Sequence, residues 1–393
     1  MTFDRLNLSR ELNQSIKKMG FTVPTKIQEK SIPLILDGKD VLGESETGSG
    51  KTLAFGCGIV EKVVPNNTLQ ALILTPTREL AEQVKETLWK LSYHRKLKVI
   101  SIYGGVSINP QIEQLKRAEV VVATPGRFRD HLGRNTVDTS AIKILVLDEA
   151  DRMLDMGFIE DIMHIIRACP NREQTLFFSA TLPPAIKKLA QQYQKSPVKI
   201  ATQKFVDPSK LKQGYYDVPS SLKISLLIHL IKKDLSGRLM VFCNTRKSTD
   251  LVVKNLKLHN INAVALHGGY SQEKRIKAIG QFKVGKARVL VCTDVAARGI
   301  DIKNISTIYN YEIPNDPTDY VHRIGRTARA GKHGQVINLL SDNNHDNFSR
   351  VLQNYREFKI EKLRTPFIKR VKVQHTHPPH RVRKISYRSR SRW

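Results

Sequence analysis

The sequence predicts an α/β fold in two tandem domains, each with a mainly parallel β-sheet flanked by helices. Short apolar runs of strand length recur along the chain, and a polar cluster follows each run where the strand would end. Stretches with helical period lie between them, such as residues 51–63, 248–258 and 272–282. This pattern occurs once before residue 202 and again after residue 215, which divides the 393 residues into two halves of similar plan.

In the first half, the polar clusters contain residues that can hold a ligand. Strands are expected at 40–43, 72–74, 99–103, 120–122, 144–147 and 176–178. Ligands of open parallel sheets bind beyond the carboxyl ends of the strands, so the clusters are expected to converge on one edge. Glycine, proline and threonine also simply end strands, but this alternative does not explain Arg78 and Arg127.

Residues 43–53 have the composition of a phosphate-binding loop. The stretch 48–50 lets backbone N–H groups curl around anionic oxygens, Lys51 supplies a positive charge and the Thr52 hydroxyl can ligate Mg²⁺. Ser45 stands where the general pattern has its first glycine, so a plain surface turn is the alternative. The strand before the loop and the helical run after it favour the phosphate loop.

An acidic tetrapeptide, residues 148–151, follows the apolar run 144–147. Asp148 is therefore expected at the carboxyl end of a buried strand, where a carboxylate can hold the Mg²⁺ that bridges two phosphates. Glu149 beside it can orient or deprotonate an attacking water. Together with the phosphate loop, this tetrapeptide predicts a nucleoside triphosphatase.

The second half has strands but no phosphate loop. Strands are expected at 239–242, 263–266 and 289–291, each followed by a polar cluster. We therefore expect the second domain to supply groups in trans to the nucleotide site of the first. The link between the domains is expected near residues 202–212, a polar stretch that contains Asp207-Pro208.

These clusters resemble the motifs of the DEAD-box RNA helicases of superfamily 2, in the order and spacing of that family over residues 3–340. Residues 20–28 resemble the Q motif, and Phe3 stands at the upstream aromatic position. The other motifs of the first half are motif I at 45–52, motif Ia at 76–81, the paired glycines at 104–105, motif Ib at 124–127, motif II at 148–151 and motif III at 179–181. In the second half, motif IV corresponds to 242–245, motif V to 293–301 and motif VI to 322–329. Ala328 stands where the commoner family residue is glycine, and Glu46 where many members carry glutamine.

The resemblance implies two RecA-like domains and a tail. Residues 1–205 would form the ATP-binding domain, residues 206–361 the helicase C-terminal domain, and residues 362–393 a basic, disordered RNA-binding tail. The implied cofactors are ATP and Mg²⁺, with Thr52 and Asp148 as metal ligands. The implied catalytic residues are Lys51, Asp148, Glu149, His322, Arg326 and Arg329.

The resemblance also implies how the nucleotide is held. The nucleotide-binding residues would be Phe21, Thr22, Lys26, Gln28, Ser45, Glu46, Thr47, Gly48, Ser49, Gly50, Lys51, Thr52, Gly299, Asp301, Arg326 and Arg329. Gln28 carries a donor and an acceptor, which suits pairing with an adenine edge, although a polar helix position is the alternative. Phe21 and Phe3 would pack either around adenine or in the core.

Residues of the second domain and of motif III receive further roles from the resemblance. Arg326 and Arg329 would act as arginine fingers, His322 would help to fix the water network, and Asp301 would accept from the ribose hydroxyls. Ser179 and Thr181 would couple the two domains through hydrogen bonds.

RNA is the implied partner, as single strand and short duplex. The implied contacts are Pro76, Thr77, Arg78, Gly105, Thr124, Gly126, Arg127, Thr245, Arg246, Gly268, Gly269, Thr293 and Arg298. Such donors bind phosphates and sugars, so recognition is expected to be independent of base sequence, with 2′-hydroxyl contacts separating RNA from DNA. Ribonucleoprotein complexes are further expected partners.

Composition agrees with a polyanionic partner. The chain has 65 Lys and Arg against 36 Asp and Glu, a net charge of +29. Its four cysteines show no ligand spacing and are expected to be reduced thiols in a cytoplasmic protein. No apolar run approaches the roughly 20 residues of a membrane span, and the polar start is no signal peptide. A monomer is expected.

The end of the sequence is one-sided in charge. No acidic residue follows Glu361, and residues 362–393 hold eleven Lys or Arg. Residues 375–393 have the composition of a disordered basic arm, with Tyr387 and Trp393 able to stack on bases. A solvated tail that only increases solubility is the alternative.

The sequence therefore favours an ATP-dependent RNA helicase. It would hydrolyse ATP to ADP and phosphate when stimulated by RNA, and would unwind short duplexes or remodel RNA–protein complexes. An RNA clamp or annealing factor whose grip is controlled by ATP is the second hypothesis, and the intact Glu149, Arg326 and Arg329 favour the enzyme. A DNA-translocating relative is the third.

Overall fold

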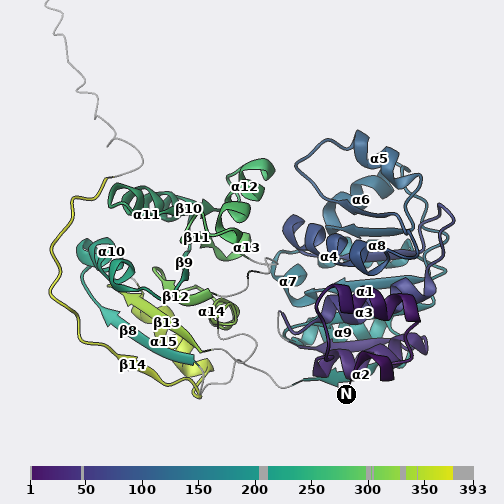
Figure 1. The fold of residues 1–393 in the computed structure, drawn as a ribbon, viewed down its shortest axis with the longest axis horizontal. Helices are drawn as coiled ribbons and strands as arrows, with labels where there is room; N and C mark the ends of the chain where they lie inside the picture. Colours follow the sequence, from purple (N-terminus) through teal and green to yellow (C-terminus); the bar gives the residue numbers. More distant parts are fainter. Residues whose placement is uncertain are drawn as a thin grey trace, which may run out of the picture. The chain divides into compact units, whose positions relative to one another are not determined.

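The computed structural model describes residues 2–45, 48–202, 211–297, 302, 305–327, 333–342 and 344–374. The chain forms two compact units. Met1–Leu211 makes up the body of the first, and the second contains Lys212–Ala296, Ile305–Arg323 and the residues from Gln335 on. Each contains a seven-stranded sheet with helices packed on it (Figure 1). The sequence predicts this α/β plan but not all of the strands. Most of the expected link, residues 203–210, lies outside the described residues.

The sheet of the first unit is parallel throughout. Its strands are β1 (Val41–Glu44), β2 (Ala71–Leu74), β3 (Val99–Ile102), β4 (Val120–Ala123), β5 (Ile144–Asp148), β6 (Gln174–Ser179) and β7 (Val198–Ala201), in the order β3-β4-β2-β5-β6-β1-β7. In register, Ala71 lies opposite Val120 on one side and Ile144 on the other. The central strands are apolar on both sides because helices cover both faces of the sheet. Only β7 has no counterpart among the strands expected from the sequence.

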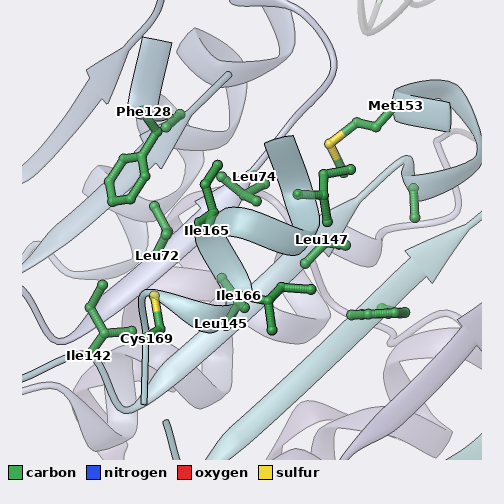
Figure 2. Packing of buried hydrophobic residues seen from close by; sticks show 14 of the residues in the cluster. Leu72, Leu74, Phe128, Ile142, Leu145, Leu147, Met153, Ile165, Ile166 and Cys169 are labelled. Carbon is green, nitrogen blue, oxygen red and sulfur yellow. The ribbon is translucent and has the colours of Figure 1, made fainter. Parts of the chain in front are cut away.

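The helices of the first unit bury the two faces of this sheet in separate clusters. They are η1 (Phe3–Arg5), α1 (Arg10–Lys18), α2 (Lys26–Leu36), α3 (Lys51–Lys62), α4 (Arg78–Leu91), α5 (Asn109–Leu115), α6 (Pro125–Gly133), α7 (Ala150–Asp155), α8 (Ile159–Arg167) and α9 (Pro184–Tyr193). Helices α2, α3 and α4 pack on the face that carries Ile73 and Val146. Helices α6 to α9 pack on the face that carries Leu72, Leu145 and Leu147 (Figure 2).

The N-terminal segment packs on the outside of the layer formed by α2, α3 and α4. Phe3, Leu12 and Ile16 form a cluster with Leu53 of α3 and Leu91 of α4. Phe3 is only 3% exposed, so the core alternative holds for this aromatic and the adenine alternative is wrong. Ser9 caps α1, because its hydroxyl accepts from Leu12 N at 3.3 Å.

The second unit repeats the strand order of the first. Its strands are β8 (Leu211–Asp217), β9 (Arg238–Cys243), β10 (Ala263–Leu266), β11 (Val289–Thr293), β12 (Ile305–Asn310), β13 (Gly334–Leu340) and β14 (Ile360–Lys362), in the order β10-β11-β9-β12-β13-β8-β14. Adding seven to each strand number of the first sheet gives the strand order of the second. Strand β8 therefore corresponds to β1, and the edge strand β14 corresponds to β7. The sequence predicts β9, β10 and β11 but misses β8, β12, β13 and β14.

Helices also cover the sheet of the second unit. They are η3 (Ser220–Leu222), α10 (Lys223–Lys233), α11 (Arg246–Leu258), α12 (Gln272–Lys283), α13 (Asp294–Ala297), α14 (Pro317–Ile324) and α15 (His345–Asn354). Across the described ranges of both units, none of the helices has the length and apolar character that crossing a membrane would require.

The chain continues beyond β14 as an extended segment, residues 363–374, which we name the C-terminal strap. Its apolar side chains pack against the core of the second unit, and Val371 N donates to Ser225 Oγ at 3.1 Å. At its end, Gln374 N donates to Asn255 Oδ1 at 3.0 Å, while Asn255 Nδ2 donates to Gln374 O at 3.1 Å. The prediction of a disordered tail from residue 362 is therefore wrong for residues 362–374, and residues 375–393 lie outside the described part.

The strap yields a prediction about stability. Ending the chain after Lys362 should lower the free energy of unfolding of the second unit by on the order of 2 to 4 kcal/mol. The truncation removes the four apolar side chains with which the strap covers the core, and their burial outweighs the entropy of ordering the strap. Ending it after Gln374 should leave stability unchanged. Urea unfolding of the two truncated chains measures the difference, and coincident curves would contradict the strap's role.

Candidate nucleotide and RNA sites

The polar clusters of the first unit gather at the carboxyl edge of its sheet, as predicted. Strands β1, β6 and β5 are neighbours, and they lead into the phosphate loop, Ser179–Thr181 and Asp148–Asp151 respectively. Strands β2, β4 and β3 are also neighbours, and they lead into the clusters that contain Arg78, Arg127 and Gly105. One edge of one sheet thus carries the expected nucleotide groups on one half and the expected RNA groups on the other.

The phosphate loop is closed by its own polar groups. Gly48 and Gly50 have φ of +85° and +95°, in the left-handed region that glycine adopts without strain. Lys51 is 5% exposed, and its Nζ donates to Ser45 O at 2.8 Å. Ser45 N in turn donates to Ser179 O at 2.9 Å, which ties the loop to the end of β6. The ammonium group is therefore buried and bonded to the first residue of the phosphate loop.

The Q-motif segment is bonded directly to this loop. Thr25 and Gln28 form a capping box at the start of α2, in which Thr25 N donates to Gln28 Oε1 at 2.9 Å. The Gln28 Nε2 donates to Gly50 O at 3.0 Å, and Thr25 Oγ1 donates to Ser49 O at 2.7 Å. These bonds use one N–H and one lone pair of the Gln28 amide, which leaves a second N–H and a second lone pair, and its pairing with adenine stays a prediction.

The other Q-motif residues lie at the surface. Phe21 is 37% exposed, and Thr22 and Lys26 are exposed as well. The core alternative for Phe21 is therefore wrong, and its contact with adenine remains a prediction. Helix α2 begins at Lys26, so the exposed segment leads into the helix whose cap holds the phosphate loop.

The acidic tetrapeptide sits in a strained turn. Asp148 is 2% exposed at the end of β5, and burial raises the pKa of its carboxyl to about 7 although the charge of Lys51 opposes this shift. Glu149 follows with φ of +53°, and its N–H donates to Asp148 Oδ1 at 3.0 Å. A non-glycine residue in this left-handed conformation costs about 1 to 3 kcal/mol, and such strain gathers at functional sites. Nothing in the sequence predicts this left-handed conformation at Glu149.

Asp151 connects this turn to the end of β6. Its backbone N–H donates to Ser179 Oγ at 3.1 Å, and its Oδ2 accepts from both the backbone N–H and the hydroxyl of Thr181 at 2.9 Å each. Ser179 and Thr181 thus bind the acidic segment within the first unit. Their expected coupling to the second domain stays a prediction.

The expected RNA groups of the first unit are held close together. Arg78 begins α4, whose cap is Thr77, and a Cβ atom on Gly105 would lie 2.3 Å from the Arg78 guanidinium. Gly105 has φ of +78°, so glycine is favoured here for its backbone conformation. Pro76 precedes this cap and is buried.

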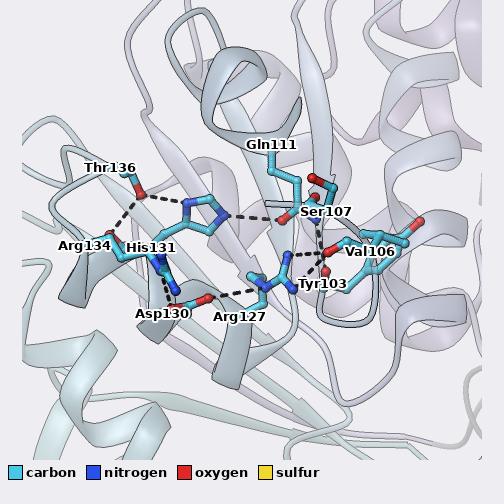
Figure 3. Close-up of polar contacts among 9 residues, drawn as sticks. All are labelled: Tyr103, Val106, Ser107, Gln111, Arg127, Asp130, His131, Arg134 and Thr136. Atoms are coloured by element: carbon cyan, nitrogen blue, oxygen red, sulfur yellow. Dashed lines mark hydrogen bonds and ion pairs between the residues drawn. The ribbon is translucent and has the colours of Figure 1, made fainter. Parts of the chain in front are cut away.

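A network of polar contacts fixes the loop after β3 (Figure 3). Both terminal nitrogens of Arg127 donate to Val106 O at 3.1 Å, and its Nε lies 3.7 Å from Asp130. The Gln111 amide donates to Tyr103 O at 3.1 Å, while its Oε1 lies 3.3 Å from Nε2 of the buried His131. Thr124 and Gly126, at the start of α6, complete this group. Hydrogen bonds within the first unit thus hold the predicted RNA residues of this loop region.

Burial decides the charge state of the histidine in this network. It lowers the pKa of His131, and the charge of Arg127 lowers it further. A neutral ring can accept on one nitrogen and donate from the other, which suits its contacts with Thr136 at 2.8 Å and with Gln111.

The second unit assembles its RNA group in the same way. Thr245 caps α11, since its hydroxyl accepts from Ser248 N at 3.0 Å, and Arg246 begins the helix. Added Cβ atoms on Gly268 and Gly269 would lie 3.4 Å from the Arg246 side chain. Thr293 ends the neighbouring strand β11. These predicted residues are therefore together at the carboxyl edge of β9, β10 and β11.

Arg323 holds a network of buried contacts that the sequence analysis does not predict. Its side chain is 1% exposed, and Nε and Nη2 bind the Asp294 carboxylate at 2.6 and 2.7 Å. Nη1 donates to Asn310 Oδ1 at 3.0 Å and to Glu312 O at 2.6 Å, and Nη2 donates to Asn244 Oδ1 at 2.9 Å. One guanidinium group thus joins the loops after β9, β11 and β12. Its position within residues 322–329, which resemble motif VI, is the sequence feature that could have drawn attention to Arg323.

The remaining predicted residues divide into two sets. His322 is on α14 beside Arg323, and Arg326 follows this helix and is 5% exposed. The predicted residues outside the described part of the chain are Glu46, Thr47, Arg298, Gly299, Asp301 and Arg329.

A phosphate loop and a buried acidic pair on one edge of a RecA-like sheet define a P-loop nucleoside triphosphatase. Residues 25–189 match the DEAD/DEAH box helicase family, and residues 222–331 match the helicase conserved C-terminal domain.

Individual relatives are similar over most of the chain. The ATP-dependent RNA helicase CshA of Limosilactobacillus reuteri is 44% identical over 349 residues, which are 88% of this chain and 70% of the relative. The DEAD-box ATP-dependent RNA helicase CshA of Geobacillus kaustophilus is 42% identical, covering 93% and 79%. The solved structure of S. cerevisiae Dbp5 bound to RNA and ADP BeF3 is 33% identical with a TM-score of 0.84, covering 92% and 95%. The chain belongs to the DEAD-box family of ATP-dependent RNA helicases.

The link between Gln28 and the phosphate loop yields a prediction. Gly50→Ala should weaken ATP binding about tenfold or more, because alanine is strained at φ of +95° and its Cβ atom would lie 2.2 Å from Gln28 Nε2. Gly133→Ala is the control, since nothing lies within 4 Å of its added Cβ atom. Titration with a fluorescent ATP analogue measures both, and equal affinities would contradict the argument.

The Arg323 network yields a prediction about the stability of the second unit. Arg323→Lys keeps the charge but loses the fork that binds Asp294, so the second unit should lose about 3 kcal/mol, the lower end for a broken buried pair. Hydrogen exchange of peptides from the second unit in urea measures this loss. Arg356→Lys changes an exposed arginine and should leave exchange unaltered. Equal protection in the two variants would show that the network is not structural.

Proposed function

We propose that the chain couples hydrolysis of ATP to local separation of short RNA duplexes or to remodelling of RNA–protein complexes. The observation that carries the proposal is the shared sheet edge of the first unit, where the strained Asp148-Glu149 turn and the phosphate loop neighbour the Arg78 and Arg127 clusters. Nucleotide and RNA would then bind to loops joined by one rigid sheet. Strain and burial at Glu149 support a catalytic role there, which a simple clamp would not need.

In this proposal the phosphate loop and Lys51 bind the β- and γ-phosphates, and Glu149 orients the attacking water and takes its proton. Mg²⁺ would be held by Asp148 and Thr52, which offer a carboxylate and a hydroxyl oxygen beside the phosphate loop. Such a pair fits a cation that takes most of its other ligands from phosphates and water. The bound metal would supply charge stabilisation of the phosphates.

The helicase C-terminal domain predicted from the sequence, residues 206–361, would complete hydrolysis through its arginines. Arg326 and Arg329 would stabilise charge on the γ-phosphate, with His322 fixing the water network and Asp301 binding the ribose. Burial of Arg326 directly after the helix of Arg323 supports a fixed position for this side chain. The dependence of turnover on RNA would follow from the need to assemble these groups.

RNA would be held by its backbone. The described candidates present caps, backbone N–H groups and guanidinium groups, which suit phosphates and sugars rather than base edges. Recognition would therefore be independent of sequence, and Gln28 would select adenine in the nucleotide. We also propose that the protein acts in the cytoplasm.

The catalytic assignment predicts a separation of binding from turnover. Glu149→Gln keeps the shape of the side chain but removes the base, so it should bind ATP and RNA while RNA-stimulated ATPase activity falls by about 10² to 10⁴-fold. Lys51→Ala should instead weaken ATP binding. Glu160→Gln removes an exposed carboxylate on α8 and should behave as the parent.

Steady-state ATPase assays and a strand-displacement assay with and without ATP measure these effects. Hydrolysis by Glu149→Gln at the parent rate would remove Glu149 from the mechanism. Equal strand displacement with and without ATP would favour the annealing factor over the helicase.

A further inference from the structure

The C-terminal strap has two different sides. Leu363, Ile368, Val371 and Val373 are partly buried against the second unit. The side chains between them point the other way and are exposed: Arg364, Thr365, Phe367, Lys369, Arg370 and Lys372. The ring of Phe367 is 96% exposed, which makes it the most exposed large apolar side chain in the described part of the chain.

The outward side is held in place rather than free. Val371 N is bonded to the buried Ser225, and Gln374 forms a pair of hydrogen bonds with the buried Asn255 of α11. These bonds and the apolar packing fix the backbone on both sides of the exposed cations. Because the strap is already ordered, a ligand that binds it does not have to supply the entropy of ordering it.

The charge of the strap has one sign. Residues 362–374 contain five Lys or Arg and no acidic residue. Within the described ranges, no ion pair neutralises any of these five cations, although the first unit pairs many of its surface charges in this way, as in Lys90 with Glu86. An unpaired row of cations on a fixed backbone attracts a polyanion.

The exposed aromatic ring selects among polyanions. Cations bind any row of phosphates or carboxylates, but a fully exposed ring among them adds a stacking platform, which single-stranded nucleic acid uses. We propose that the outward side of the C-terminal strap, with Phe367 as its stacking residue, is a second binding surface for single-stranded RNA. This inference rests on the proposed function, which supplies RNA as the partner.

The surface lies apart in sequence and in fold from the RNA candidates at the strand ends. Those residues follow β9, β10 and β11, whereas the strap follows β14 and packs over α10 and α11. It would add contacts to RNA that the motif residues already hold, so it should raise affinity without adding base specificity.

Equilibrium binding of a fluorescein-labelled 20-nucleotide single-stranded RNA to full-length variants tests the proposal. Phe367→Ala should weaken binding about 5-fold to 150-fold, the range for loss of one stacked base. Its control is Leu235→Ala, which removes another apolar side chain that is 90% exposed. Equal affinities for Phe367→Ala and the control would overturn the stacking role.

The cations are tested by salt dependence. The triple variant of Lys369, Arg370 and Lys372 to Gln should reduce the slope of log K against log salt by about 2, at about 0.7 per single-strand contact. The matched control changes Lys187, Lys188 and Lys195 to Gln, which removes the same charge from exposed positions of the first unit. Equal slopes for the two triple variants would show that the strap does not contact RNA.

Two further readouts separate the alternatives. Phe367→Ala should bind labelled polyglutamate as the parent does, and an equal loss for RNA and polyglutamate would overturn the assignment to RNA. The ATPase activity of the parent is measured beside these assays. A parent without ATPase activity would count against the proposed function, while the binding data would still decide the strap.

Discussion

The carboxyl edge of a parallel sheet is the constraint on which both units depend. All strands of the first sheet end on the same side, so segments far apart in sequence, such as residues 45–52 and 148–151, become neighbours through β1, β6 and β5. The second sheet uses the same strand order and brings Arg246, Gly268 and Thr293 together. Loop chemistry can therefore differ between the units while the frame stays the same.

Two buried lysines show that the same strand order can hold different polar groups in the two units. Lys51 begins α3 after β1, and Lys223 begins α10 after the corresponding strand β8; both are 5% exposed. Lys51 donates to Ser45 O at 2.8 Å, at the start of the phosphate loop. Lys223 instead donates to Asn344 Oδ1 at 2.6 Å and to Ser341 Oγ at 3.3 Å, and burial lowers its pKa to about 8. The second unit thus uses its lysine inside its own fold, and holds its loops through Arg323.

The sequence predicts what depends on composition and period. Strands such as β5 and β11 are uniformly apolar because both faces are buried, and glycine-rich clusters mark their ends. It does not reveal what depends on the folded neighbourhood. The capping box of Gln28, the left-handed backbone of Glu149 and the bonds of Arg323 each require partners that are distant in sequence. Strands β12 and β13 are not predicted because their apolar runs are not followed by a polar cluster of the kind that can bind a ligand.

The strap shows why charge alone misled the interpretation of the C-terminus. In the first unit the last strand of the sheet, β7, lies at its edge, and in the second unit the corresponding β14 comes at Ile360–Lys362. The folded unit cannot end before its edge strand is complete. Beyond it, apolar residues at 363, 368, 371 and 373 face the core while cations face out, so a basic composition coexists with order. A one-sided charge therefore marks one surface of a packed segment here, and does not by itself indicate disorder.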